Sequence, residues 1–207
     1  PLQSVALKDQ VKGLLRDKML MLMLLGGVFH FVPLVCSDIF LSTHLASLEI
    51  EPLWTGIAIS AGIAVEVVVL SYSAHILASY RPSLIFMVAV LLGIVRFLGM
   101  NISSAGWQIF CCQALHGFCF GLFWIAIVEM VAARTVDKMP ATGQSLLSAV
   151  VVGLGAGVGI AGASWLVRNY DTTALFQANF IFECLAFVIC LILIGVSRAQ
   201  RAQEQVL

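Results

Sequence analysis

The sequence predicts an all-α integral membrane protein, a bundle of six transmembrane helices. The chain has 207 residues, of which 61% are hydrophobic and only 11% are charged, whereas a soluble domain carries roughly 25% charged residues. Its mean hydropathy is +1.04. The apolar residues are gathered into six long runs, and each run meets or approaches the ~20 residues that a helix needs to cross a bilayer. A bilayer can cover this much apolar surface, but a soluble core cannot.

The six runs give the boundaries of the predicted helices. We expect them at residues 19–45, 53–78, 83–100, 106–131, 142–167 and 173–196. The third is short, and the first, second and fourth are long enough to tilt. The chain then divides into a linker segment at 1–18, the six-helix part at 19–197 and a tail at 198–207. Because the chain starts without Met and opens on a mixed-charge segment, we expect it to be the interior of a longer polypeptide.

The basic residues are distributed unevenly between the two sides of the predicted bundle. Nine of the eleven fall on one side: Lys8, Lys12, Arg16, Lys18, Arg81, Arg134, Lys138, Arg198 and Arg201. Arg168 falls on the opposite side, and Arg96 lies within a predicted helix. Loops rich in Lys and Arg stay on the cytoplasmic side of a membrane. We therefore expect both termini to be cytoplasmic, with the protein in the inner (plasma) membrane.

Composition and spacing disfavour several function classes. The net charge is zero, and no basic patch is interleaved with aromatic residues, so a nucleic-acid partner is not expected. His30, His44 and His75 lack metal-ligand spacing and are expected to be structural or interfacial. The cysteines lie inside apolar runs without zinc-site spacing: Cys36, Cys111, Cys112, Cys119, Cys184 and Cys190. We expect no metal, no cofactor and no enzymatic activity.

Ionisable residues inside the predicted helices are the candidate functional groups. A charge near the bilayer centre costs at least ~2.5–3.5 kcal/mol, so it persists where it is paired, faces water or has a function. Given the direction of each helix, Glu66, Arg96 and His116 all fall at middle depth. Gln113 shares a helix face with His116, and Asp38 lies either in the same cavity or near the outer headgroups. We expect these five residues to bind substrate and couple protons; a static ion pair that fixes helix register is the alternative.

The chemistry of these groups fits coupled transport. Glu66 can accept hydrogen bonds from solute hydroxyls when ionised, or carry a proton when neutral. Arg96 stays charged under all relevant conditions, and a histidine such as His116 has an unperturbed pKa near ~6.5. A further acid, Glu183, lies in the sixth predicted helix without an evident partner.

Aromatic and small residues complete the candidate set. Phe120 and Trp124 continue the face of Gln113 and His116, and with Cys119 they are candidates for lining a cavity whose aromatic floor would suit a sugar or a ring-bearing solute. Ordinary helix packing is the competing interpretation. The fifth run carries glycines four residues apart, which let helix backbones approach closely in lipid: Gly153, Gly155, Gly157 and Gly159. Without a preceding strand, this run is not a nucleotide-binding loop.

Several of these residues carry a resemblance to a known superfamily. Residues 113–121, Gln-Ala-Leu-His-Gly-Phe-Cys-Phe-Gly, resemble the tenth helix of the lactose permease-like branch of the major facilitator superfamily, and of its phenylpropionate and nucleoside permease relatives. Residues 140–145, Pro-Ala-Thr-Gly-Gln-Ser, resemble the entry into helix eleven. Glu66 and Arg96 resemble the acid of helix eight and the arginine of helix nine. The resemblance covers nearly all of the chain.

The resemblance implies that the six helices are helices seven to twelve of a twelve-helix transporter, whose N-terminal half rocks against this one around a central site. In lactose permease-like symporters, the helix-eight acid binds sugar, the helix-nine arginine facilitates deprotonation, and the helix-ten histidine ties sugar binding to proton transfer. Those roles fall on Glu66, Arg96 and His116. Cys119 occupies the position of the proton-carrying acid, so the resemblance leaves four options: a proton carried by Glu66, by Asp38 or by a group in the other half, or a different form of coupling. Residues 74–82 keep only the basic residue, Arg81, of the usual loop motif.

We therefore expect a secondary active transporter of a small solute (a sugar, nucleoside or aromatic acid) that works by proton-coupled symport with the proton as coupling ion. Its expected partners are the solute, membrane lipid and the N-terminal six-helix half of the same transporter. An exporter of the same fold, and a native six-helix scaffold or homodimer, are the alternatives. An intramembrane serine protease is disfavoured because Ser145 lies at a helix entry, whereas His116 lies at the midplane.

Overall fold

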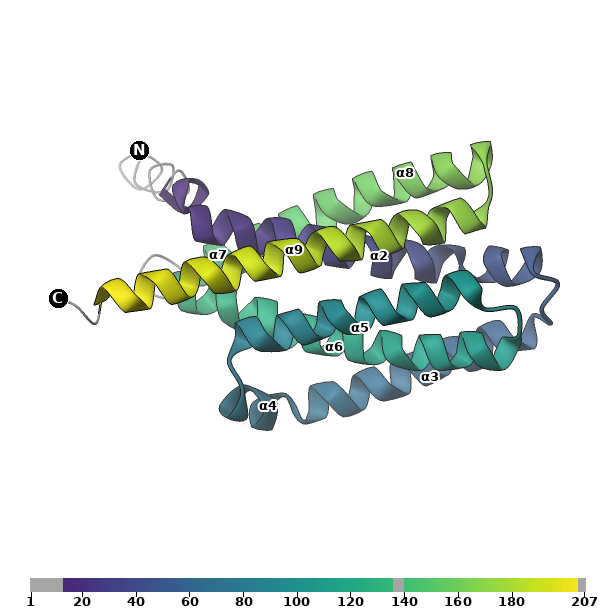
Figure 1. The fold of residues 1–207 in the computed structure, drawn as a ribbon, viewed down its shortest axis with the longest axis horizontal. Helices are drawn as coiled ribbons and strands as arrows, with labels where there is room; N and C mark the ends of the chain where they lie inside the picture. Colours follow the sequence, from purple (N-terminus) through teal and green to yellow (C-terminus); the bar gives the residue numbers. More distant parts are fainter. Residues whose placement is uncertain (1–12, 136–139, 205–207) are drawn as a thin grey trace.

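The computed structural model describes residues 13–135 and 140–204 as a helical bundle (Figure 1). Its helices are α2 (Lys18–Ser47), α3 (Leu53–Ser71), α4 (Ser73–Ser79), α5 (Pro82–Ile102), α6 (Gly106–Thr135), α7 (Pro140–Leu147), the π-helix η1 (Ser148–Gly155), α8 (Ala156–Asn169) and α9 (Thr172–Glu204). Since α7, η1 and α8 form one continuous span, the described residues contain six helices long and apolar enough to cross a membrane. The predicted all-α six-helix bundle is confirmed.

The second predicted helix, 53–78, is wrong in its length. α3 ends at Ser71, and α4 begins at Ser73 after a break at Tyr72, whose φ and ψ are −95° and 9°. The N–H of Tyr72 lies 3.2 Å from the carbonyl oxygens of both Val68 and Val69, so the last turn of α3 tightens instead of continuing. The Ser71 hydroxyl also donates to the Val67 carbonyl at 2.7 Å, and such a side-chain bond competes with the helical ladder.

The predicted end segments differ from the structure as well. α9 runs to Glu204, so residues 198–204 of the expected tail continue the sixth helix. Of the expected linker at 1–18, residues 1–12 lie outside the described residues, as do Lys8, Lys12 and Lys138 of the positive-charge count. α2 begins at Lys18 behind an N-cap, Asp17, whose Oδ1 accepts the N–H groups of Met19 and Leu20 at 3.0 and 3.2 Å. A capping carboxylate satisfies amide donors that a helix start leaves free.

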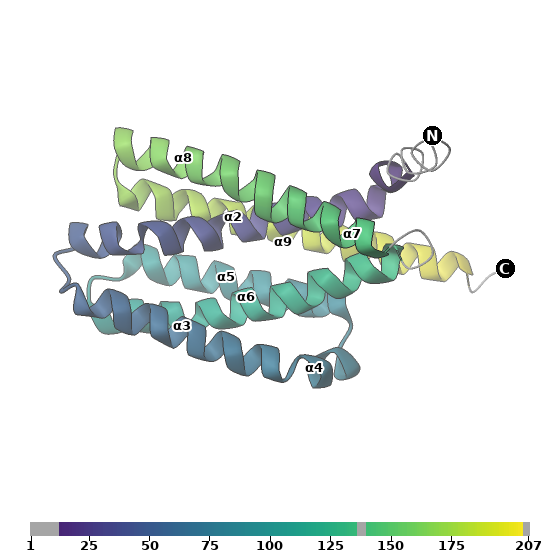
Figure 2. The ribbon, with the colours of Figure 1, turned by 180° about the vertical axis from the view of Figure 1, so that it is seen from behind.

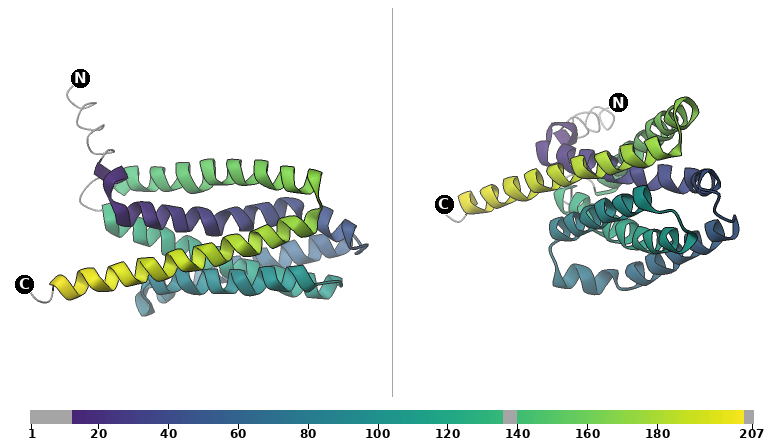
Figure 3. Two further views of the ribbon diagram at one scale, coloured as in Figure 1. Left: turned by 45° about the horizontal axis from the view of Figure 1, so that its top comes forward. Right: turned by 45° about the vertical axis from the view of Figure 1, so that its right-hand side comes forward.

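The bundle has a buried centre and two exposed edges. α2 crosses the middle, with 67% of its apolar window buried, against 17% for α3 and 22% each for α9 and for the span that contains η1 and α8. α3 and α8 lie at opposite edges of the bundle (Figure 2). The start of α2 and the end of α9 lie at one end of the molecule, where α9 extends beyond its neighbours (Figure 3). We call this the terminal end of the bundle.

The glycine-rich fifth span approaches α2 at two positions. An added Cβ at Gly159 would lie 2.5 Å from Cγ1 of Val32, and one at Gly155 would lie 3.3 Å from Cγ2 of Val28. The alternate glycines face elsewhere: a Cβ at Gly153 would meet only the Ser148 carbonyl at 3.7 Å, and one at Gly157 would meet no described atom within 4 Å. The structure thus places Gly155 and Gly159, but not the other pair, at a close helix contact.

Polar residues separate two apolar clusters along the bundle. The cluster toward the terminal end contains Leu24 of α2, Phe86 of α5 and Ile127 of α6. The cluster toward the opposite end contains Leu41 of α2 and Phe97 of α5, together with residues of α6 and α9. Six of the buried polar residues lie at middle depth: His30, Ser37, Arg96, Gln113, His116 and Glu183. The others are His44, Ser103, Thr135, Thr172 and Asn179. The fold therefore holds a polar layer, which contains every buried acid and arginine of the described residues, in the middle of the bundle.

Candidate functional site

Arg96 is the centre of the polar layer, and its side chain is fully buried. Its Nη2 donates to Oγ of Ser37 at 2.9 Å and to Oε1 of Gln113 at 2.5 Å, and it lies 3.8 Å from Oδ1 of Asp38. Among the described residues, Nε and Nη1 of Arg96 have no hydrogen-bond partner. A buried charge needs an opposite charge nearby. The carboxylate that supplies it here belongs to Asp38.

Asp38 links Arg96 to the histidine and the amide of α6. Its Oδ1 accepts from Nε2 of Gln113 at 3.4 Å, and its Oδ2 lies 3.3 Å from Nε2 of His116. The Asp38 side chain is 40% exposed, whereas that of His116 is 10% exposed. The sequence left open whether Asp38 lies in the cavity or near the outer headgroups. The structure places it beside Arg96 and His116, in the cavity. One carboxylate thus contacts side chains from α5 and α6 while half open to a cavity.

That cavity has a volume of about 200 Å³ and lies between α2, α3 and α6. Its lining consists of two carboxylates, an amide, an imidazole and three apolar side chains: Asp38, Glu66, Gln113, His116, Ile59, Ile63 and Phe120. Glu66 is half-buried, and among the described residues it forms no ion pair with Arg96. Four of the five predicted polar residues therefore line one cavity. The fifth, Arg96, does not line the cavity but contacts two of the residues that do, Gln113 and Asp38.

Close packing of α3 on α6 places Glu66 opposite His116. An added Cβ at Gly62 of α3 would lie 2.9 Å from the Gln113 carbonyl oxygen, and one at Gly117 of α6 would collide with the Gly62 carbonyl. Glycines on both helices let the two backbones approach at this level. Glu66 follows Gly62 by one turn and thus enters the cavity beside the α6 residues.

The aromatic residues of α6 form a stacked row. The ring centroids of His116 and Phe120 are 6.1 Å apart, and those of Phe120 and Trp124 are 6.0 Å apart with an interplanar angle of 5°. Phe120 lines the cavity, but Trp124 and Cys119 are not among its lining residues. Cys119 is fully buried.

A second ionisable pair lies outside this cavity, and sequence reasoning missed it. Nδ1 of His30 lies 2.8 Å from Oε2 of Glu183, and both side chains are fully buried. The two residues are 153 positions apart, so no local spacing connects them. The available signal was the cost of an unpaired acid in the sixth apolar run, and the sequence offered no way to choose its partner.

The comparison with known families decides the superfamily. The family model of the MFS_1 like family matches residues 3–178. The chain belongs to the MFS_1 like family. The expected membership of the major facilitator superfamily is therefore confirmed, and the protein is a multi-pass membrane transporter. The lactose permease-like branch stays a prediction, and no curated protein matches the chain.

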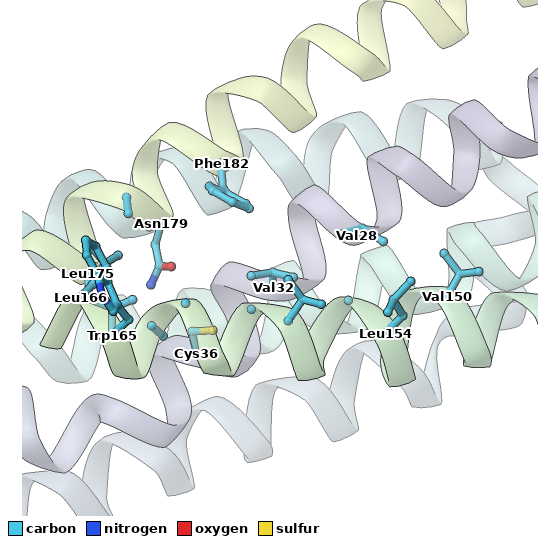
Figure 4. A pocket seen from close by; sticks show the side chains of 16 residues that line it. Val28, Val32, Cys36, Val150, Leu154, Trp165, Leu166, Leu175, Asn179 and Phe182 are labelled. Carbon is cyan, nitrogen blue, oxygen red and sulfur yellow. The ribbon is translucent and has the colours of Figure 1, made fainter. Parts of the chain in front are cut away.

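This major facilitator has a second, larger cavity that differs in character from the polar one. It measures about 590 Å³ and lies between α2, α8 and α9, where Val28, Val32 and Phe182 point toward it (Figure 4). Its lining is apolar apart from Asn179, whose Nδ2 is buried and has no hydrogen-bond partner among the described residues. Because transport chemistry needs several convergent polar groups, the cavity beside Arg96 is the better candidate for a solute site in the MFS_1 like protein.

Proposed function

We propose that this chain forms the C-terminal half of a proton-coupled symporter for a small neutral solute that carries hydroxyl groups, such as a sugar or a nucleoside. The observation that carries the proposal is the convergence of Asp38, Glu66, Gln113 and His116 on one cavity beside a buried arginine. The N-terminal six-helix half is the proposed partner, and the proposed location is the inner (plasma) membrane with the terminal end of the bundle in the cytoplasm.

The proposed solute class follows from what the cavity presents. Asp38 and Glu66 offer carboxylate oxygens as acceptors for hydroxyl groups, and Gln113 offers an amide. The Phe120 ring provides a flat apolar surface for the face of a sugar or a nucleobase. The cation, Arg96, is fully buried behind Gln113. An aromatic acid would therefore bring a third carboxylate toward two others, and we rank it below sugars and nucleosides.

The proposed coupling follows from the shared bonds of Asp38. When ionised, it balances the charge of Arg96 and accepts from Gln113; when protonated, it leaves the buried guanidinium without a counter-charge. A solute hydroxyl that donates to Asp38 bonds to the same carboxylate that balances Arg96. Solute binding and protonation would thus be linked through Asp38 and Arg96, and symport requires that this linkage be positive.

The exposed edges of the bundle support a partner half. α3 and the span containing α8 are apolar enough to cross a membrane, yet 17% and 22% of their apolar windows are buried within this chain. A second bundle would cover part of these faces, and lipid would cover the rest. The solute cavity lies against α3, so the second bundle could complete its wall.

The test is solute-induced alkalinisation of the medium around cells that express the full-length gene product containing this chain. We expect external pH to rise with one sugar or nucleoside, and the rise to be abolished in Glu66→Gln. Glu129→Gln is the control, because Glu129 is an exposed acid of α6 outside the cavity lining. Absence of a rise with any sugar, nucleoside or aromatic acid would refute proton symport and favour export or uncoupled transport. A native six-helix scaffold would bind none of these solutes.

A further inference from the structure

We propose that His30 and Glu183 form the binding site of the coupling proton, separate from the solute cavity. This inference rests on the proposed function and extends it, because it assigns the proton to a place that the cavity residues do not occupy. The site brings together α2, α5, α6 and α9, whereas the solute cavity lies between α2, α3 and α6. Four features of the pair support the assignment.

The first feature is the geometry of the imidazole. Nδ1 of His30 lies 2.8 Å from Oε2 of Glu183, and Nε2 lies 3.4 Å from the carbonyl oxygen of Cys119. Both ring nitrogens thus face oxygen acceptors. A neutral imidazole has one N–H donor, whereas an imidazolium has two. The surroundings therefore fit a ring that has gained a proton, held as an imidazolium–carboxylate pair with zero net charge.

The second feature is the slot that holds the carboxylate. Glu183 lies against the backbone of α5 at Gly93, where an added Cβ would lie 2.7 Å from Cδ and 2.8 Å from each carboxylate oxygen. Oε1 of Glu183 has no hydrogen-bond partner among the described residues. A buried acceptor without a partner is costly, and apolar side chains of similar volume often stabilise a core as well as an ion pair does. Packing stability alone therefore does not explain why an acid occupies this buried position.

The third feature is isolation from bulk water. The ring of His30 packs against Phe86, with centroids 6.0 Å apart, and against Phe123, with centroids 5.0 Å apart. Both phenylalanines are fully buried. These rings shield a proton on the His30–Glu183 pair from bulk water in this conformation. It can enter or leave only when the helices move, which is how a coupling site must behave in alternating access.

The fourth feature is electrostatic contact with the solute site. The charge of Arg96 acts on Asp38 of the cavity and on Glu183 of the pair. The other titratable groups that face the pair are Cys119 and His116 of α6 and Cys184 and Cys190 of α9. Arg96 thus connects the two sites. When the pair releases its proton, its charge changes from zero to −1, and Arg96 is drawn from Asp38 toward Glu183.

The experiment compares two transport modes of the full-length protein in membrane vesicles, with the solute found by alkalinisation. In Glu183→Gln we expect solute exchange, which moves no net proton, to stay within about twofold of wild type. Accumulation driven by a pH gradient should fall at least tenfold, and alkalinisation should disappear. His30→Gln should behave in the same way, and Glu129→Gln should keep both modes. The pH dependence of uptake should flatten in the two pair variants only.

Four outcomes separate the possibilities. If Glu183→Gln and His30→Gln still accumulate solute and alkalinise the medium, the inference is overturned and the proposed function stands. If exchange and accumulation fall together, with less protein in the membrane, the pair is structural, and the inference is again overturned. If Glu183→Gln does not fold, His30→Gln and Glu183→Asp decide by the same readouts. If wild type itself gives no alkalinisation with any solute, the proposed function fails and the inference fails with it.

Discussion

The replacement Gly93→Ala tests the buried pair through protein stability, independently of transport. The new Cβ would lie 2.7 Å from Cδ of Glu183, whereas ordinary contacts begin at 3.4 Å. The carboxylate must therefore move by about 0.7 Å, and a movement of that size along the 2.8 Å contact with His30 brings it to the limit of a hydrogen bond. Overpacking costs ~1–3 kcal/mol, and a hydrogen bond to a charged group contributes ~1.5–3 kcal/mol. Since both losses are partial, we expect a destabilisation of about 3 kcal/mol.

The assay is unfolding in detergent, with Gly99→Ala as the matched control on the same helix. Its Cβ would lie 2.7 Å from Sγ of Cys112, so it produces a similar clash without touching an ionisable pair, and we expect it to cost about 1 kcal/mol. The double variant of Gly93→Ala with Glu183→Ala should show a coupling of at least ~1 kcal/mol, because the second change removes the group that the first one displaces. Equal melting of the two glycine variants, together with additive effects in the double variant, would refute the packing of Glu183 on Gly93.

Three further predictions follow from the cavity and from the terminal end. Phe120→Ala should weaken solute binding by about 2- to 10-fold in an equilibrium binding assay, because an aromatic contact contributes ~0.5–1.5 kcal/mol. The pH profile of binding should stay the same, and a changed profile would contradict a purely apolar role for Phe120. Asp38→Asn leaves the Arg96 charge without its carboxylate and should lower the free energy of unfolding by up to ~3 kcal/mol. The double variant of Asp38→Asn with Arg96→Gln should recover part of that loss, and no recovery would contradict the pairing. Burial raises the pKa of Asp17, but hydrogen bonds from Arg134 and the helix amides outweigh burial and lower the pKa overall. The stabilisation that ionised Asp17 contributes is therefore complete above the unfolded pKa of ~3.9 and is lost as the pH falls below that value. The melting temperatures at pH 6 and pH 3 should accordingly differ less in Asp17→Asn than in wild type.

The depth of residues along the membrane could be predicted from the sequence, but their direction around each helix could not. Each residue adds 1.5 Å along a helix, so counting from the span ends places Arg96 and His116 in one layer, and the structure shows them linked through Asp38. Rotation about the axis depends on which faces pack together, and spans that are apolar on every side do not reveal it. For that reason Cys119 was expected to line the cavity but does not, and Glu183 had no evident partner.

The irregular points within the helices could not be predicted from the sequence for a related reason. Hydropathy is continuous through Tyr72, so the break between α3 and α4 does not interrupt the apolar run, although two serines flank it. In the fifth span, η1 occupies Ser148–Gly155, which contains no proline and only one polar residue, Ser148 at its start. π-Helical turns inside a helix occur mostly at functional sites. This one lies next to Gly155, which contacts Val28 of α2, so a change of winding there would shift α8 against the helix that carries Asp38 and His30.

Charge balance explains why the two polar sites would work as one device. With the proton on the pair, the buried charges of His30, Glu183, Arg96 and Asp38 sum to zero, which an apolar bundle tolerates. Loss of that proton leaves two carboxylates and one guanidinium. Arg96 cannot deprotonate, so it can balance only one of them fully. While the pair holds its proton, Arg96 stays beside Asp38 and Gln113, which line the solute cavity. Deprotonation would draw Arg96 toward Glu183 and disturb that lining, so the proton would favour solute binding, and the solute would favour proton binding, without any direct contact between them.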